Sequence, residues 1–319
     1  MPAGPGAVKP ARGISFTMAP ALVILAAGMG SRYGGDKHAA AVGPDDATIS
    51  DYLIYDAIRA GFGAVVLVIR DGMQRQLDET ICRRFQGRVA ISYAVQRLED
   101  VPAGHRAPPS ASRAKPWGTT HAVLTGARGL TVPFGAVNAD DLYGPAAFAR
   151  LASFLQQPPT ADTHALVGFA LQETLSPNGA VNRGVCRVNA AGMLDRIREV
   201  KGLERQDGGA AYRDEGGAVR VLPGDTPVSM NMWGFQPTVV GALERRFTAF
   251  LDRQGGDPAA ECLLPATVED LVRDGTIRVQ VLTGPYTWWG ITYPADRAVV
   301  ARAIERLIAS GVYPARLDA

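Results

Sequence analysis

Four glycines and two basic residues follow a short apolar run near the N-terminus. The run, residues 22–26, is rich in branched side chains and predicts a buried strand. The residues of interest after it are Gly28, Gly30, Arg32, Gly34, Gly35 and Lys37. Glycines let a backbone turn tightly and direct several N–H groups toward one ligand. Together with two fixed positive charges, such a loop suits the triphosphate of a nucleotide.

The best-known glycine-rich patterns do not fit this loop. The dinucleotide pattern G-x-G-x-x-G fails because Tyr33 occupies its third glycine position, and no acidic residue lies about 20 residues on after a βα unit. The P-loop pattern fails because no Gly-Lys-Ser/Thr follows. On the loop alone, a phosphate site and a purely structural turn therefore both stay open.

A pair of acidic residues ends another expected strand. Residues 134–139 predict that strand, and the sequence at its end reads Asn138-Ala-Asp140-Asp141. Ligands of open α/β sheets bind outside the carboxyl ends of the strands, and Mg²⁺ takes oxygen ligands there while bridging to substrate phosphates. The alternative is that one aspartate only caps a turn. Because the pair accompanies a phosphate loop, we expect Asp140 to bind Mg²⁺.

A third polar segment reads Lys115-Pro-Trp-Gly-Thr-Thr-His and predicts a tight turn that leads into a helix. Backbone and hydroxyl groups of Gly118, Thr119 and Thr120 could read the edge of a base, and the alternative is a plain helix N-terminus. We expect His121 to make local hydrogen bonds. No histidine of the chain stands in a recognisable pattern with a nucleophile and a carboxylate, so nothing indicates a catalytic triad.

The elements that position these segments alternate between strands and helices. The first expected strands are residues 22–26, 64–69 and 89–95, and the helices between them begin at Thr48 and at Met73. This order implies a mostly parallel sheet with right-handed crossovers. Further helices are expected over residues 121–128, 145–155, 239–251, 267–273 and 295–310. Further strands are expected over residues 165–171, 228–235 and 276–282, with a hairpin over residues 185–200.

Two segments interrupt the pattern. Residues 98–115 predict a long loop that is a functional lid or disordered, and residues 208–217 predict a glycine-rich surface loop. We find no internal repeat and no clear linker. The expected organisation is a flexible tail over residues 1–18, a main domain over residues 19–260, and a C-terminal extension over residues 261–319 that packs on the same domain.

Composition narrows the class of protein. The chain has 319 residues, 47% of them hydrophobic and 20% charged, which is ordinary for a globular protein. A net charge of +2 gives no reason to expect nucleic acid or an anionic membrane as a partner. Three distant cysteines fit a reducing compartment without disulfides. Residues 14–30 superficially resemble a secretory signal, but Pro20 interrupts them, so we expect a cytoplasmic protein.

Five segments, taken in order, resemble the nucleotidyltransferase family that includes the sugar-1-phosphate nucleotidylyltransferases (NDP-sugar pyrophosphorylases). They are Leu-Ala-Ala-Gly-Met-Gly-Ser-Arg with Lys37, Gln96 with residues 115–122, residues 134–144, residues 182–201, and residues 229–235. The match runs from about residue 20 to the C-terminus. It implies an α/β fold of three layers (α/β/α) around a mostly parallel mixed sheet, Rossmann-like and similar to the GT-A fold.

The resemblance also implies roles for individual residues. Ala27, Gly28, Gly30 and Arg32 would hold the triphosphate, Lys37 would neutralise the α-phosphate, and Gln96, Gly118 and Thr119 would select the base. Asp140 would bind Mg²⁺, Gly184, Glu199 and Asn231 would hold sugar hydroxyls, and Lys201 would bind the sugar phosphate. The implied substrates are an NTP and a sugar phosphate. The sequence does not specify the base, the sugar or the oligomeric state, and a homo-oligomer stays open.

The sequence departs from the family pattern at several positions. Asp36 precedes Lys37 where the family often has proline, and Glu-Val-Lys replaces the commoner Glu-Lys-Pro at residues 199–201. The second metal-binding aspartate, expected near a C-terminal Trp-x-Asp-x-Gly segment, is absent from Trp288-Trp289-Gly290. We expect Asp296 to cap the closing helix.

Two alternative functions stay open at this point. A glycosyltransferase that consumes a nucleotide sugar would use Asp140 and Asp141 as a metal site, but it would not need the glycine loop. A non-catalytic protein that binds a nucleotide sugar would explain the missing second aspartate and the change at Asp36.

Overall fold

The computed structural model describes residues 19–28, 41–105, 113–158, 160, 162–291, 293 and 295–318. The expected N-terminal tail, residues 1–18, lies outside the described residues. Gly30, Arg32 and Lys37 of the glycine loop also lie outside them. Within the described part, no helix is both long and apolar enough to cross a membrane.

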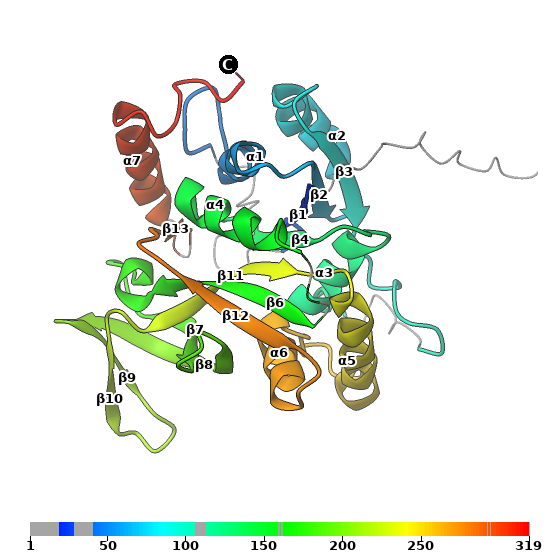
Figure 1. The fold of residues 1–319 in the computed structure, drawn as a ribbon, viewed down its shortest axis with the longest axis vertical. Coiled ribbons are helices and arrows are strands. Elements are labelled where there is room, and N and C mark those ends of the chain that lie inside the picture. The colour runs from blue at the N-terminus through cyan, green and yellow to red at the C-terminus, as the bar shows by residue number, and fades with distance from the viewer. Residues whose placement is uncertain are drawn as a thin grey trace, which may run out of the picture.

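Four parallel strands form one side of the central sheet (Figure 1). They are β1 (Ala21–Leu25), β2 (Ala64–Ile69), β3 (Ala90–Val95) and β4 (Phe134–Asn138), in the spatial order β4-β1-β2-β3. Strands β1 and β2 are almost wholly buried, which explains why their sequences are continuous apolar runs. Right-handed βαβ units of this kind place the carboxyl ends of all four strands at one edge.

The other side of the sheet is largely antiparallel. Strand β11 (Pro227–Phe235) pairs antiparallel with β4, and the sheet continues through β7 (Val181–Val188), β8 (Leu194–Gln206), β9 (Gly209–Arg213) and β10 (Val219–Pro223). Strand β6 (Thr163–Ala170) also pairs with β11, and β12 (Arg278–Thr283) adds to β6 in parallel. A separate pair of two-residue strands joins β5 (Asp141–Leu142) to β13 (Trp289–Gly290). The prediction of a mixed sheet is confirmed, with parallel pairing concentrated around β1.

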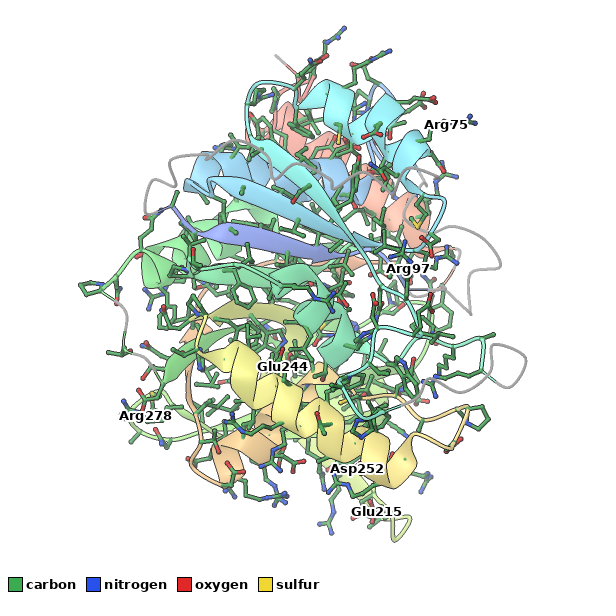
Figure 2. The ribbon with its side chains drawn as sticks, turned by 90° about the vertical axis from the view of Figure 1, so that its right-hand side faces the viewer. Arg75, Arg97, Glu215, Glu244, Asp252 and Arg278 are labelled. Carbon is green, nitrogen blue, oxygen red and sulfur yellow. The ribbon has the colours of Figure 1, made fainter. Side chains whose placement is uncertain are left out.

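Helices cover both faces of this sheet, which makes the fold three-layered. One face carries α1 (Ile49–Ala60), α4 (Gly144–Leu155) and α7 (Asp296–Ala309), and the other carries α3 (Thr119–Ala127), α5 (Val239–Gln254) and α6 (Leu264–Arg273). Alternate residues of β1 serve the two cores: Leu22 packs with the first set and Val23 with the second. Figure 2 shows α5 toward the viewer, with Glu244 and Asp252 on its exposed side.

Local sequence signals account for the best-predicted helix. Thr48 caps α1, and the side chain of Asp51 accepts a hydrogen bond from the Thr48 backbone N–H at 2.7 Å, which completes a capping box. Gly61 ends the helix in the left-handed conformation, with φ of 89°. This helix begins and ends where the sequence predicts.

One expectation about local structure is wrong, and one expected helix is present in a modified form. The surface loop expected over residues 208–217 belongs instead to a hairpin, because β9 and β10 pair around a turn at Asp214–Gly217. The continuous helix expected over residues 73–85 is interrupted: α2 (Gln74–Leu77) passes into a π-helical turn, η2 (Asp78–Cys82). The apolar residues that recur every fourth position from Met73 still face the core in part, since Ile81 and Phe85 are buried.

The C-terminal turn closes over α1 through one buried hydrogen bond. The Tyr313 hydroxyl donates to Oδ2 of Asp56 at 2.7 Å, and both side chains are nearly inaccessible to solvent. Burial raises the pKa of Asp56 to about 7, although the bond to Tyr313 opposes this shift. The folded protein therefore holds a proton on Asp56 across a pH range in which the unfolded chain has lost it.

Replacing Asp56 by asparagine should remove a pH dependence of stability. A folded-state pKa above the ordinary value makes stability greatest at low pH and lowers it as pH rises from about 4 to about 7. Between about pH 5 and pH 8 the wild type should lose roughly 2–3 kcal/mol more free energy of unfolding than Asp56→Asn. Urea denaturation of both proteins at each pH measures this difference, and parallel pH profiles would contradict it.

Candidate functional site

The acidic pair and the start of the glycine loop leave neighbouring strands at the same edge of the sheet. In the parallel pairing of β1 with β4, Leu25 lies opposite Asn138. The Ala139 N–H also donates to the carbonyl oxygen of Leu25 at 3.3 Å. Gly28 follows β1 and Asp140 follows β4 within a few residues of this bond. The described start of the segment proposed for phosphate, at Gly28, is therefore adjacent to the pair proposed for the metal ion.

A fully buried tyrosine holds the acidic pair in place. Oδ2 of Asp141 accepts a hydrogen bond from the Asn138 amide at 2.9 Å and lies 3.3 Å from the Tyr143 hydroxyl oxygen. The same hydroxyl accepts the Asn138 backbone N–H at 3.1 Å and lies 2.8 Å from the carbonyl oxygen of Met230, to which it donates. Tyr143 thus ties the end of β4 to β11, and it orients Asp141 between them.

The charge balance of the acidic pair fits a divalent cation. Burial, and then the negative charge of Asp140, raise the pKa of Asp141 to about 7. Two adjacent carboxylates are an oxygen donor set of the kind that Mg²⁺ takes, with substrate phosphates and water completing its shell. The described residues contain no cluster of three or more histidine, cysteine or acidic side chains that could form a complete protein cage.

The C-terminal segment that would carry a second acidic ligand contacts the pair directly. Gly290 pairs with Asp141, and a Cβ built on this glycine would lie 2.6 Å from Oδ1 of Asp141. Asp296 serves elsewhere, because it accepts the Tyr293 N–H at 2.7 Å at the start of α7 and the Asn178 amide at 2.8 Å. The expectation that Asp296 caps this helix is wrong: Asp296 is the first residue of α7, the N-cap position is Ala295, and the Asp296 carboxylate accepts hydrogen bonds from groups outside the helix.

A cleft of about 260 Å³ opens beside the acidic pair. Its wall comes from three adjacent strands whose register aligns Glu199 of β8, Gly184 of β7 and Ser229 of β11 in one row. Burial raises the pKa of Glu199, while the nearby charges of Arg183 and Lys201 lower it. The lining residues are Asn138, Asp140, Asp141, Asn182, Arg183, Gly184, Glu199, Ser229, Met230, Asn231, Pro265, Trp288 and Ile291.

Asn231 enters this cleft from an irregular point of β11. The register of β11 against β6 shifts between Ser229 and Trp233, and Asn231 adopts a left-handed conformation with φ of 58°. Asparagine tolerates this conformation better than most residues. Its Oδ1 accepts the Trp233 indole N–H at 3.3 Å. The bulge thus brings a polar side chain to a position that regular pairing would turn elsewhere.

The cleft includes one cation that the sequence analysis missed and excludes one that it proposed. Lys201 is exposed on β8 and does not belong to the cleft lining, so its role as phosphate ligand stays a prediction. Arg183 of β7 lies in the lining and is 7% exposed. It stands inside the quoted segment Asn182-Arg-Gly, but a charged residue on a strand is usually solvated, and no sequence signal marks it as buried.

The segment proposed to read the base is assembled at the end of β3. The Gln96 amide donates to the Gly118 carbonyl oxygen at 3.3 Å and lies 3.1 Å from Nδ1 of His121. The Thr119 hydroxyl accepts the Leu264 N–H at 2.8 Å. Gly118 has a φ of 103°, and an added Cβ would lie 2.6 Å from the carbonyl oxygen of residue 262. Gln96, Gly118 and Thr119 therefore lie together, each with a structural contact of its own.

His121 is a buried local hydrogen-bonding residue, in agreement with the prediction. Its Nε2 lies 2.8 Å from the Asp100 carbonyl oxygen, and its ring stacks on Phe247 with centroids 5.0 Å apart. Burial lowers the pKa of His121. The neutral ring thus fixes the loop that follows β3 against α5.

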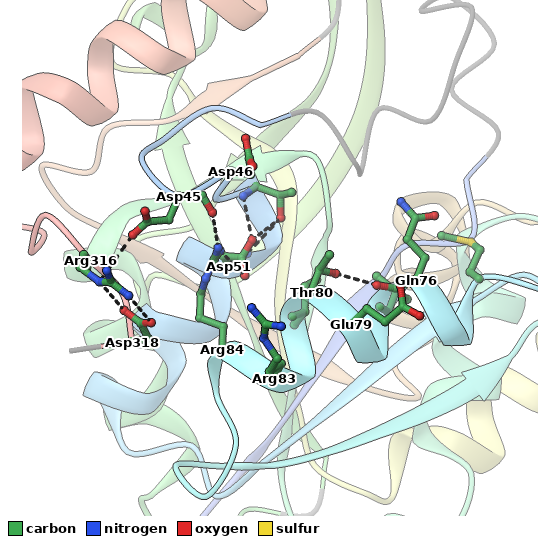
Figure 3. A pocket seen from close by; sticks show the side chains of 14 residues that line it. Asp45, Asp46, Asp51, Gln76, Glu79, Thr80, Arg83, Arg84, Arg316 and Asp318 are labelled. Atoms are coloured by element: carbon green, nitrogen blue, oxygen red, sulfur yellow. Dashed lines mark hydrogen bonds and ion pairs between the residues drawn. The ribbon is translucent and has the colours of Figure 1, made fainter.

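Another cavity, of about 470 Å³, lies between the loop before α1, η2 and the C-terminal turn (Figure 3). Two of the arginines that line it are already held in ion pairs: Arg84 with Asp51 at 2.9 Å, and Arg316 with Asp318 at 2.9 Å. It shares no lining residue with the cleft beside Asp140. We interpret it as a charged contact between the chain end and α1.

Comparison with known proteins identifies the fold. No family model matches the sequence, and no curated protein sequence matches it. Among solved structures, the inositol-1-phosphate CTP transferase from T. maritima superposes with a TM-score of 0.58 at 16% identity, over 92% of this chain and 97% of that one. A UDP-glucose pyrophosphorylase complexed with UDP-glucose gives a TM-score of 0.56 at 16% identity, over 91% and 99%.

A third match agrees with these two. A putative glucose-1-phosphate thymidylyltransferase from Bacillus anthracis, in complex with a sucrose, gives a TM-score of 0.57 at 12% identity, over 89% of this chain and 96% of that one. The superpositions cover nearly the whole length of each protein. The resemblance noted in the sequence is therefore confirmed at the level of the fold: this chain has the fold of the sugar-1-phosphate nucleotidyltransferases.

Removing the Tyr143 hydroxyl should destabilise the edge of the sheet that carries Asp141. Tyr143→Phe leaves the Asn138 N–H and the Met230 carbonyl without their buried partner, which should lower the free energy of unfolding by about 1–3 kcal/mol. Tyr55→Phe is the matched control, because its hydroxyl makes no hydrogen bond within the described residues. Urea denaturation compares the two, and equal stability of both variants would contradict the role given to Tyr143.

Proposed function

We propose that this chain is a nucleotidylyltransferase that transfers NMP from an NTP to a sugar 1-phosphate, or to a similar phosphorylated acceptor, and releases pyrophosphate. The observation that carries the proposal is the adjacency of Gly28 and the Asp140–Asp141 pair at one sheet edge, beside a polar cleft. The reaction needs a polyphosphate, a cation and an acceptor to meet at one place. The fold match supports this reaction class.

The chemistry requires positioning more than proton transfer. An oxygen of the acceptor phosphate, already anionic at neutral pH, attacks the α-phosphorus of the NTP. The bond from that phosphorus to the oxygen bridging to the β-phosphate breaks, and pyrophosphate leaves with the bonding electrons. No general base is needed, so in-line alignment and neutralisation of charge account for catalysis.

The proposed roles divide along the sheet edge. Backbone N–H groups at Ala27 and Gly28, with Gly30, Arg32 and Lys37, would hold the triphosphate, while Gln96, Gly118 and Thr119 would contact the base. Glu199, Asn231 and the backbone at Gly184 would hold acceptor hydroxyls. Asp140, with Asp141 beside it, would hold Mg²⁺, which when bound supplies positive charge against the phosphates.

Two features of the site are also compatible with other functions. The adjacent acids Asp140 and Asp141 would also suit a metal-dependent glycosyltransferase, and Gly290 in place of an acid would suit a nucleotide-sugar-binding protein without activity. The products discriminate among the three. Pyrophosphate indicates the nucleotidyltransferase, a free nucleoside diphosphate indicates the glycosyltransferase, and binding without turnover indicates the third.

Pyrophosphate release from a panel of NTPs and sugar 1-phosphates should require Asp140. Asp140→Asn keeps the size of the side chain but removes its charge, and should lower kcat at least about 100-fold, as loss of a main electrostatic contact does. Asp225→Asn, in the exposed turn before β11, is the matched control and should keep full activity. Wild-type turnover by Asp140→Asn, or turnover unaffected by EDTA, would contradict the metal role.

A further inference from the structure

One buried charged side chain of the cleft, Arg183, makes no direct ion pair within the described residues. Arg183 donates from Nη1 to the Asn182 carbonyl oxygen at 2.8 Å and from Nη2 to the Thr174 carbonyl oxygen. Within the described residues, its Nε–H has no acceptor and no carboxylate forms an ion pair with it. Only 7% of the residue is exposed. The buried carboxylate of Asp141, by contrast, accepts a hydrogen bond from the Asn138 amide.

The surroundings of Arg183 hold its guanidinium in a fixed place. It lies 5.0 Å from the ring centroid of Trp288, within cation–π range, and both side chains line the cleft beside Asp140. They also line a second cavity of about 220 Å³ behind them, so they form a wall between the two spaces. Thr174 ends the short helical turn η3 (Leu171–Thr174) just before β7, and Trp288 comes from a segment far from β7 in the sequence, so distant parts of the chain build this arrangement.

A buried charge that lacks a direct ion pair is only partly compensated for its lost hydration. Burial lowers the pKa of Arg183 to about 10, while the charges of Asp141, Glu199 and Asp296 raise it, so the guanidinium stays charged at neutral pH. Two backbone carbonyls compensate only part of its lost hydration. An anion that enters the cleft would complete the compensation, and a guanidinium fork matches the geometry of a phosphate group.

We propose that Arg183, backed by Trp288, binds the anionic group of the acceptor, and that this group is a phosphate monoester. The inference deepens the proposed function, on which it rests only for the identity of the acceptor. It assigns the contact to a buried arginine of β7, in place of Lys201, which is exposed and lies outside the cleft lining. A sugar that lacks phosphate would leave Arg183 uncompensated, so the site would select against it.

Direct binding tests the proposal without requiring turnover. Isothermal titration calorimetry with the full chain would use glucose 1-phosphate, inositol 1-phosphate and inorganic phosphate as probes. Arg183→Gln should raise the dissociation constant of the tightest probe at least about tenfold, and Arg183→Lys should restore part of the loss. Arg187→Gln, exposed on the same strand and 3.7 Å from Asp195, is the matched control and should change it less than about twofold.

Kinetics then separate this proposal from the proposed function. Arg183→Gln should raise KM for the acceptor and leave KM for the NTP nearly unchanged. Turnover by the wild type, with an unchanged acceptor KM in Arg183→Gln, would overturn the role of Arg183 and leave the function intact. Arginine-dependent phosphate binding, with no pyrophosphate release from any substrate pair, would support the anion site and overturn the function.

A measurement on the wild type covers the case in which Arg183→Gln does not fold. Hydrogen–deuterium exchange with and without the tightest probe should show added protection in β7 around residues 181–184, and none in the β9–β10 hairpin. Failure of every probe to bind the wild type, or protection confined to other elements, would overturn the proposal.

Discussion

The parallel pairing of β1 with β4 is the constraint on which the site depends. It fixes Leu25 opposite Asn138, so that the chain leaves both strands at the same edge of the sheet. Strand β1 is buried on both faces, and a one-residue slip in its register would turn each of its side chains toward the opposite face of the sheet. Such a slip is therefore disfavoured. Gly28, where the glycine loop begins, and the acidic pair therefore lie close together because hydrophobic burial determines the strand register.

The antiparallel half of the sheet supplies what the parallel half lacks. Parallel strands present only their ends to a ligand, whereas β7, β8 and β11 present a row of side chains next to those ends. The bulge at Asn231 and the wall made by Arg183 and Trp288 shape this row into a cleft. The division suits two substrates of different chemistry, a nucleotide along the strand ends and a smaller phosphorylated acceptor against the strand faces.

Much of the fold follows from local sequence signals. Apolar runs predict β1 and β2, because buried strands have continuous apolar sequences. Thr48 and Gly61 predict the two ends of α1, because capping residues lie within a few positions of the helix. The hairpin of β9 and β10 was missed since glycines and charges conceal short exposed strands. The pairing of β5 with β13 could not be predicted either, because two-residue strands far apart in sequence carry no periodicity.

The site residues that the sequence predicts correctly are those that belong to recognisable motifs. Gln96, Gly118, Asp140, Gly184 and Glu199 come from quoted segments, and the structure brings the last three to one cleft. Arg183 was not recognised, because its burial depends on Thr174 and Trp288, which only tertiary packing brings to it. Lys201 lies outside the cleft lining, next to Gly202, which adopts a φ of 67° where the register between β8 and β7 shifts.

The most direct test of the whole account is a crystal structure of the full chain with Mg²⁺ and a non-hydrolysable NTP. The account predicts the triphosphate within hydrogen-bonding distance of the Gly28 backbone N–H, with the metal ion bound by Asp140. A triphosphate bound in the cavity between Asp45 and Arg316, or anywhere out of reach of Asp140, would contradict it.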